Sequence, residues 1–162
     1  MVASQPIEPP SVDLGMLIRR PPHDVFEALA DPSITSKFWY TKSSGRMAEG
    51  AELTWEWEMY GVARTIRVQK FDTDSKIQFT WDNYNPEEPT TVEFTLIPYE
   101  NDTTYLHITE TGYGGDLQAQ VDGVRDSTAG FAYLIAALKA TLEHDVTLRL
   151  VQDENPPNLQ RH

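Results

Sequence analysis

The chain has 162 residues, a formal net charge of −12 and no cysteine. This length suits one domain, and the lack of cysteine excludes disulfides, thiol nucleophiles and cysteine-ligated metal sites. The excess of acidic residues repels phosphate backbones and anionic lipid headgroups, so no nucleic-acid or membrane-surface partner is expected. No apolar run approaches the roughly 18 residues of a membrane-spanning helix, and residues 1–11 do not resemble a signal peptide. We therefore expect no membrane insertion and a cytoplasmic location.

The N-terminal part predicts a flexible leader over residues 1–11, then a strand and two short helices. Apolar residues alternate with others over residues 12–18, a period of two that is typical of a strand. A first short helix follows Pro21-Pro22. Asp31-Pro32 can both end this helix and cap a second one, which we expect to close at Trp39-Tyr40.

The middle of the chain predicts a run of strands. From Leu53 to Met59 apolar and aromatic residues alternate with polar ones without a break, which indicates a strand with one buried and one solvated face. Further strands are expected between turn-rich breaks, over residues 63–71, 76–81, 90–98 and 104–111. Because the connections are short, consecutive strands should pair as an antiparallel meander.

The C-terminal part changes to helical spacing. After a glycine-rich joint at residues 112–115, apolar residues recur every three or four positions over residues 117–142, which predicts one long helix. Gly123 interrupts this pattern, so the helix is expected to be firmest over residues 125–143. The polar tail over residues 151–162 is expected to be mobile.

A single helix after many strands constrains the architecture. One helix cannot cover a broad flat sheet, so the apolar face of the sheet needs another solution. A strongly curved sheet can wrap around the helix, with the two short helices closing its open end. The predicted fold is therefore α+β: a curved antiparallel sheet around a long C-terminal helix, in one domain over residues 12–150. A cavity is expected between the sheet and the helix.

Several short motifs, in this order, resemble the START-like (SRPBCC) superfamily. Residues 18–32, IRRPPHDVFEALADP, followed by Phe38-Trp39, are similar to the opening of the branch formed by the heat-shock protein 90 ATPase activator homologues. Residues 103–113, TTYLHITETGY, are similar to the last strand of that branch. Gly130-Phe131 resembles its Gly-Trp helix motif, with Phe in place of Trp. The resemblance covers about residues 12–150 and implies a helix-grip fold over a cavity.

Motifs for catalysis or cofactor binding are absent from the sequence. The four histidines show no His-x-x-x-His spacing, and the glycines at residues 112–115 lack the lysine of a phosphate-binding loop. No serine lies in a nucleophile elbow. We therefore expect no metal and no cofactor, and the residues do not specify an enzyme.

Strand alternation selects a set of residues that face the helix. Most are apolar or aromatic, as in the walls of ligand pockets, although buried aromatic residues are more often plain core. Arg64 and Glu110 fall on the same face, where they would pair, hold the polar end of a ligand, or reach water at the strand ends. The candidate ligand-binding residues are Trp39, Trp55, Trp57, Arg64, Ile66, Val68, Phe79, Trp81, Phe94, Leu106, Ile108, Glu110, Phe131 and Ile135.

Three functions compete at this point. The first is a binding module for a hydrophobic or aromatic small molecule, lipid-like or polyketide-like. The second is a small cyclase- or hydrolase-type enzyme that uses Glu110 or a neighbouring acid. A co-chaperone, which the family name implies, ranks last, because the chain is expected to lack the additional N-terminal domain of eukaryotic activators. A homodimer is left open.

Overall fold

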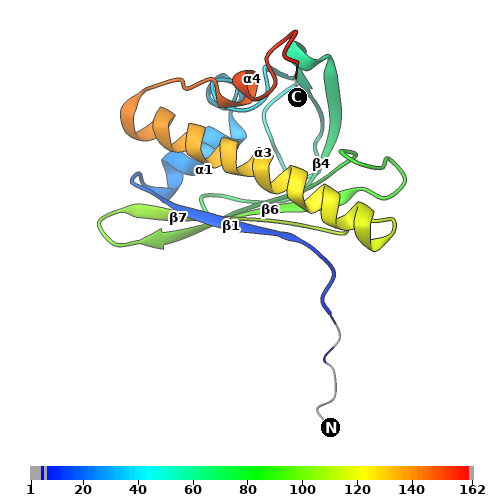
Figure 1. Cartoon of the computed structure of the whole chain (residues 1–162). Helices are drawn as coiled ribbons and strands as arrows, with labels where there is room; N and C mark the ends of the chain where they lie inside the picture. Colours follow the sequence, from blue (N-terminus) through cyan, green and yellow to red (C-terminus); the bar gives the residue numbers. More distant parts are fainter. Residues whose placement is uncertain (1–4, 6, 161–162) are drawn as a thin grey trace.

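The computed structural model describes residue 5 and residues 7–160, which form an open sheet with a long helix lying across it (Figure 1). The strands are β1 (Val12–Ile18), β2 (Lys42–Ser43), β3 (Glu52–Trp57), β4 (Val62–Asp72), β5 (Lys76–Trp81), β6 (Thr90–Tyr99) and β7 (Thr103–Thr111). The helices are α1 (Pro22–Ala30), α2 (Pro32–Thr35), the 3-10 turn η1 (Glu58–Tyr60), α3 (Leu117–His144) and α4 (Leu150–Glu154).

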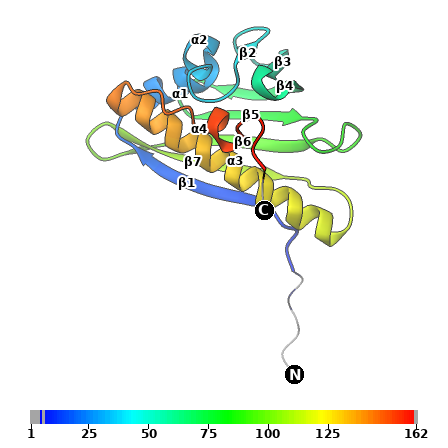
Figure 2. The same ribbon diagram turned by 45° about the horizontal axis from the view of Figure 1, so that its top comes forward.

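The sheet is an antiparallel meander, as the short connections predict. Its strand order is β1-β7-β6-β5-β4-β3-β2, and every neighbouring pair is antiparallel. The first strand pairs with the last, with Val12 opposite Glu110 and Ile18 opposite Thr104. The sheet and α3 together confirm the helix-grip α+β fold. Figure 2 shows α1, α2 and α4 on the side of the sheet that carries α3.

The core lies between the inward face of the sheet and α3. Alternate residues of β4 and β5 are buried, as a period of two requires. The helix contributes buried residues at three- and four-residue spacing. Burying each large apolar side chain stabilises the fold by roughly 1.5–3 kcal/mol before entropy is counted. Phe79, Phe131, Leu134 and Leu138 are among the least exposed.

The two early helices form, but the second is shorter than expected. The carboxylate of Asp31 accepts a hydrogen bond from the backbone N–H of Ser33 at 3.0 Å, which confirms the predicted cap. The helix then ends at Thr35 rather than at Trp39-Tyr40. The hydroxyl of Thr35 donates to the carbonyl of Ala28 at 2.6 Å and ties this turn back to α1. The chain is thereby free to turn inward and bury Tyr40 against Trp55.

The alternating segment from Leu53 also ends earlier than expected. The strand β3 stops at Trp57, and η1 follows. Met59 lies in this turn and is 37% exposed, so it does not extend the buried face. Gly61, at a φ of 61°, reverses the chain into β4. Residues 42–43, which lie outside every expected strand, form the edge strand β2. Two residues are too few for a periodic signal.

The long helix α3 runs without a break through Gly123, which was expected to weaken it. The ring of Tyr113 packs where a side chain at this position would be, because an added Cβ would lie 2.9 Å from the ring. The first turns nevertheless lie outside the core, with Leu117 at 64% exposure. The apolar stripe is therefore buried in the core only from the middle of the helix onward.

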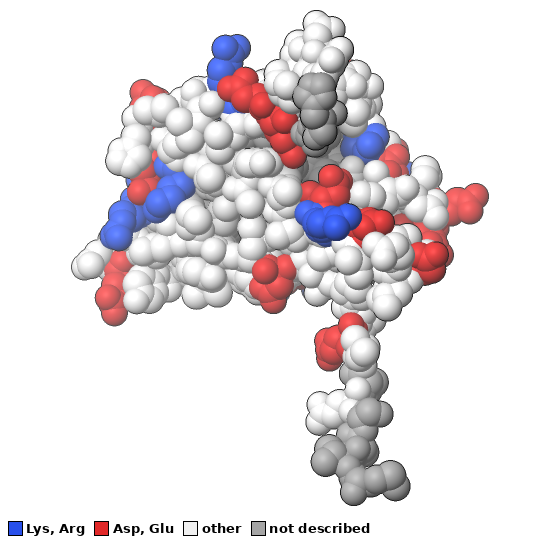
Figure 3. Space-filling view, in the orientation of Figure 1, with Lys and Arg blue, Asp and Glu red and all other residues white. Residues whose placement is uncertain are grey.

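The chain stays folded past residue 150. The helix α4 begins at Leu150, and Val151 is buried, so the tail expected from residue 151 starts inside a helix. In the part of the chain that the structure describes, no helix has both the length and the apolar character needed to cross a membrane. On the face drawn in Figure 3, acidic and basic side chains form small separate groups on a largely uncharged surface.

Candidate functional site

A cavity of about 170 Å³ opens at one end of the sheet, between the sheet, α3 and α4. Aromatic residues are the largest group in its wall, with seven of the fifteen lining residues, and five others are polar or charged. Aromatic walls with placed polar groups are usual in small-molecule sites. The lining residues are Trp39, Trp57, Tyr60, Val62, Arg64, Trp81, Asn83, Tyr84, Asp126, Ser127, Gly130, Phe131, Tyr133, Val151 and Glu154. We call this space the aromatic cavity.

Strand direction explains why these residues meet. Trp57 ends β3 and Trp81 ends β5, while Arg64 lies near the start of β4. Because neighbouring strands are antiparallel, the last residues of β3 and β5 and the first residues of β4 lie at the same end of the sheet. Residues that are far apart in the chain therefore line one opening.

The aromatic rings of the cavity pack against one another. Trp39 stacks on Phe131 with ring centroids 5.8 Å apart and an interplanar angle of 15°. Trp57 meets Trp39 edge to face at 5.6 Å, and Trp81 lies 6.0 Å from Phe131. Such pairs add about 0.5–1.5 kcal/mol each beyond the burial of their area. The wall is therefore held in place by its own contacts.

Arg64 is the basic group of the cavity. Its Nε–H donates to the side-chain oxygen of Asn83 at 3.1 Å, and Nη1 donates to the carbonyl of Ala63 at 2.9 Å. Of the three alternatives for Arg64 and Glu110, the pair between them does not form: among the described residues no carboxylate lies within 4.0 Å of the guanidinium. Glu110 instead accepts hydrogen bonds from other side chains.

Glu110 is fully buried and lies behind the cavity wall rather than in it. One carboxylate oxygen accepts from the indole Nε1–H of Trp81 at 2.7 Å and from the hydroxyl of Thr90 at 2.5 Å. The other accepts from the hydroxyl of Tyr113 at 2.5 Å. Three donors compensate the carboxylate for its lost hydration. The register prediction that Glu110 faces inward is therefore right, but the residue acts on the wall from behind.

Tyr84 lies between the aromatic cavity and a second, larger one of about 480 Å³, which Tyr113 also lines. Tyr84 borders both cavities, and its ring lies 5.6 Å from that of Tyr113. The Tyr84 hydroxyl is 2.7 Å from that of Ser127 and donates to the carboxylate of Asp126 at 2.9 Å. Burial raises the pKa of both tyrosines, and for Tyr113 the neighbouring Glu110 raises it further. Both are thus protonated hydrogen-bond donors near neutral pH, not bases.

The helix α4 closes part of the cavity mouth. Val151 and Glu154 line the cavity from this helix. The hydroxyl of Tyr60 donates to the carbonyl of Val151 and lies 3.3 Å from the carbonyl of Gln152. Tyr60 belongs to η1, so a single side chain ties α4 to the turn between β3 and β4.

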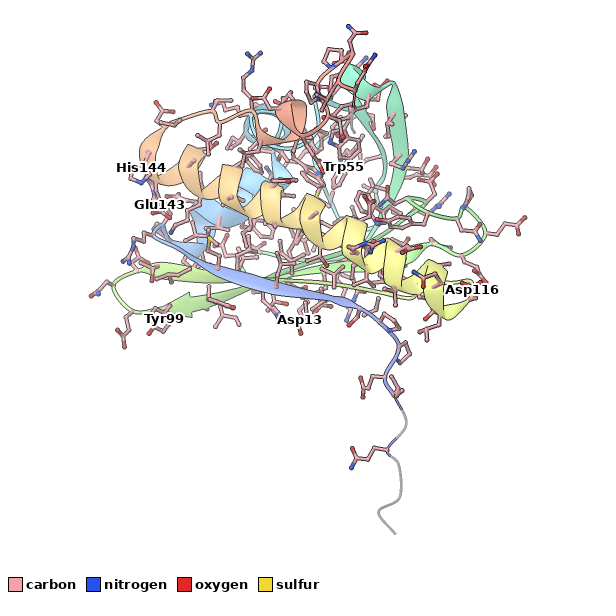
Figure 4. All side chains as sticks on the ribbon, viewed as in Figure 1. Asp13, Trp55, Tyr99, Asp116, Glu143 and His144 are labelled. Atoms are coloured by element: carbon pink, nitrogen blue, oxygen red, sulfur yellow. The ribbon has the colours of Figure 1, made fainter. Side chains whose placement is uncertain are left out.

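The candidate residues divide into three groups. Trp39, Trp57, Arg64, Trp81 and Phe131 line the aromatic cavity. Glu110 supports the wall from behind. The others are packed core that does not line the cavity, and Figure 4 shows Trp55 among the crowded side chains between α4 and β4. This packed group is Trp55, Ile66, Val68, Phe79, Phe94, Leu106, Ile108 and Ile135. The expected broad cavity under the helix is thus largely filled, and open space remains at one end.

Sequence reasoning missed the lining residues of α3 apart from Phe131, those of η1, α4 and the first residue of β4, and the two in the connection after β5. Ser127 and Gly130 lie four and one residues before Phe131, so helical spacing from Phe131 could have found Ser127. Asn83 and Tyr84 lie on an irregular connection, where no period exists. Within the residues that the structure describes, no three His, Asp or Glu side chains are grouped as around a metal ion.

Comparison with known families decides the relationship. The family model described as "Activator of Hsp90 ATPase homolog 1-like protein" matches residues 19–143. The chain belongs to this family. The match confirms the resemblance of the sequence motifs to the activator-homologue branch of the START-like superfamily. A search of curated proteins found no significant match.

Several solved structures share the fold of this chain. SSP2350 from Staphylococcus saprophyticus is 27% identical with a TM-score of 0.72, and the alignment covers 86% of this chain and 96% of that one. The Aha1 dimer from Colwellia psychrerythraea is 19% identical, with a TM-score of 0.71 and coverage of 83% and 96%. DynU16, from the dynemicin biosynthetic locus, is 21% identical with a TM-score of 0.73, and the alignment covers 85% of this chain and 48% of DynU16.

Proposed function

We propose that this AHSA1-like domain binds a small hydrophobic, aromatic molecule in the aromatic cavity. The observation that carries the proposal is a wall of stacked aromatic rings around about 170 Å³ of open space. A cavity of roughly 150 Å³ lined by apolar side chains takes up benzene. The available volume therefore suits a ligand of one aromatic ring with small substituents. Lipid-like and polyketide-like molecules are larger and would require the wall to move.

Binding fits the geometry better than an acid-catalysed reaction. Glu110, the acid named first for the enzyme alternative, does not border the cavity, and three donors already occupy its oxygens. Two neighbouring acids do line the cavity: Asp126 accepts a hydrogen bond from the Tyr84 hydroxyl at 2.9 Å, and Glu154 lies on α4. A general acid or base must come within about 3.2 Å of the proton that it transfers. Trp81 stands between Glu110 and any ligand in the cavity. The two nearby tyrosines have raised pKa values and do not supply a base.

The experiment is a titration with toluene and indole. Tryptophan fluorescence follows toluene binding, because Trp39, Trp57 and Trp81 line the cavity, and titration calorimetry follows indole, which fluoresces as tryptophan does. The test variant is Gly130→Leu, whose side chain would grow into the cavity beside Trp39. The matched control is Ala129→Leu on the exposed side of the same turn. We expect binding in the wild type and in the control, and loss of binding in Gly130→Leu with folding retained in circular dichroism.

Two results would contradict this proposal. One is a wild-type protein that binds neither probe. The other is equal binding to both leucine variants, since that would place the probe elsewhere. Because overpacking could unfold Gly130→Leu, Gly130→Ala serves as a milder second variant and should weaken binding without loss of folding.

A homodimer is also part of the proposal, supported by the dimer that the Colwellia structure describes. Light scattering at several protein concentrations tests it. A constant monomer mass of 18.4 kDa up to high micromolar concentration would contradict it.

A further inference from the structure

We propose that the ligand of the aromatic cavity carries a single carboxylate, which Arg64 binds. The inference rests on the proposed function, because it assumes that the aromatic cavity is a ligand site. It names the chemical class of that ligand: a small aromatic carboxylate, with its ring among Trp39, Trp57 and Phe131 and its acid group toward Arg64.

The guanidinium of Arg64 has donors to spare. A guanidinium carries five N–H donors in a rigid fork. One of them, on Nε, is used by Asn83 and one, on Nη1, by the carbonyl of Ala63, so three are left. The Asn83 contact also fixes the plane of the group. An oriented fork with free N–H groups on both Nη atoms matches the two oxygens of a carboxylate.

The positive charge of Arg64 lies where a counter-charge would stabilise it. The residue is half-buried and borders a cavity whose other walls are largely aromatic. No Asp or Glu among the described residues comes within 4.0 Å of it. By contrast, Arg67, three residues along the same strand but on the outer face, pairs with Glu52 at 3.2 Å. A charge beside an apolar space is stabilised by a counter-charge, and here the ligand can supply it.

Two acidic residues of the cavity limit the ligand to one carboxylate. The carboxylate of Asp126 accepts a hydrogen bond from the hydroxyl of Tyr84, and Glu154 lies on α4 at the cavity mouth. Of the described residues that line the cavity, Arg64 is the only base. A second anionic group would therefore meet repulsion and no cation. The same two acids favour an amine, which makes a cationic ring the rival ligand that the experiment must include.

The experiment compares three probes with the same ring: benzoate, benzamide and benzylamine. Each is titrated at pH 7 into the wild type, Arg64→Gln, Arg64→Lys and the control Arg67→Gln. On the wild type, benzoate should bind at least about tenfold more tightly than benzamide, as a charge-assisted hydrogen-bonded contact provides. The difference should fall below about twofold in Arg64→Gln and persist in Arg67→Gln. Arg64→Lys keeps the charge without the fork and should give an intermediate ratio.

The outcomes separate this inference from the function beneath it. If none of the three probes, toluene and indole bind, the proposed function itself fails. If benzamide binds as tightly as benzoate, the cavity is a ligand site but the carboxylate inference is overturned. Tightest binding of benzylamine overturns it as well and assigns selection to Asp126 and Glu154. Circular dichroism of the Arg64 variants shows whether a loss of binding comes from unfolding.

Discussion

The carboxylate of Glu110 accepts a hydrogen bond from the indole nitrogen of Trp81 across 2.7 Å, wholly inside the protein. Trp81 lines the cavity, whereas Glu110 lies behind it in the core. The hydrogen bond sets the rotation of the indole ring. A buried acid that touches no ligand can therefore still shape the space that a ligand occupies.

Glu110→Gln tests this role. The amide keeps the size of the carboxylate but brings an NH₂ group among three donors, so one or two hydrogen bonds must rearrange. We expect a loss of about 1–3 kcal/mol in the free energy of unfolding, and a larger loss for Glu110→Leu, which leaves the donors unpaired. Urea denaturation measures both. Glu56→Gln, on the exposed face of β3, is the control and should change stability by less than about 0.5 kcal/mol. A Glu110→Leu protein as stable as the wild type would contradict the prediction.

The two glycines of α3 should respond in opposite directions to alanine. At Gly130 an added Cβ would lie 3.8 Å from Trp39, an ordinary contact, so Gly130→Ala should stabilise the helix by about 0.5–1 kcal/mol while narrowing the cavity. At Gly123 the Cβ would lie 2.9 Å from the ring of Tyr113, so Gly123→Ala should destabilise the protein. Thermal unfolding of both variants gives the comparison. Equal changes in the unfolding temperature of the two variants would contradict the difference in packing at these two positions.

Tyr60→Phe should loosen α4 without unfolding the domain. The substitution removes only the hydroxyl that binds the carbonyls of Val151 and Gln152. A lost hydrogen bond of this kind costs about 1 kcal/mol, enough to raise the opening of α4 several-fold. Hydrogen exchange of the α4 amides should speed up accordingly, and a bound probe should dissociate faster. Tyr99→Phe, on an exposed residue, is the control and should leave exchange in α4 unchanged.

Stability should decline in acid partly through Glu143, at the C-terminal end of α3 (Figure 4). Burial alone would raise the pKa of Glu143, but the Lys139 ammonium at 2.6 Å and the Arg19 backbone N–H at 3.1 Å outweigh it and lower the pKa. A folded-state pKa below the ordinary value of 4.5 adds stability above that pH, and the gain is lost as the pH falls through the folded value.

The measurement for Glu143 is urea denaturation at pH 7 and at points below pH 4.5. The wild type should lose stability over that range, and Glu143→Gln should lose less, because its side chain does not titrate. The variant should also be less stable than the wild type at pH 7. Parallel curves for the two proteins would exclude Glu143 as a contributor to the acid sensitivity.

Periodicity predicted the elements of the sheet because it reports burial on one face. The strands expected over residues 63–71, 76–81, 90–98 and 104–111 match β4 to β7 within about one residue at each end. It failed where local pattern and tertiary packing disagree. Met59 continues the alternation of β3, yet the chain turns before it. Gly123 disfavours a helix, yet the packing of Tyr113 against it compensates.

The site was harder to predict than the fold, because inward direction does not distinguish a lining residue from a core residue. Trp55 and Trp57 have the same direction on β3, but Trp55 is packed among Tyr40, Phe79 and Trp81, whereas Trp57 lies at the open end. Trp55 and Trp57 differ in their distance from the open end of the sheet, and that distance depends on strand register. Asn83 and Tyr84 lie in an irregular connection, where no period indicates direction.

The sequence by itself determined the order of the longer strands and helices, the inward direction of Arg64 and Glu110, and the family motifs, because these are local properties of spacing and composition. Only the tertiary structure decided that Glu110 binds Trp81, Thr90 and Tyr113 and that Arg64 has no acidic partner among the described residues. Partners of a buried charge depend on which strand ends meet, and that is settled by register and packing over the whole sheet.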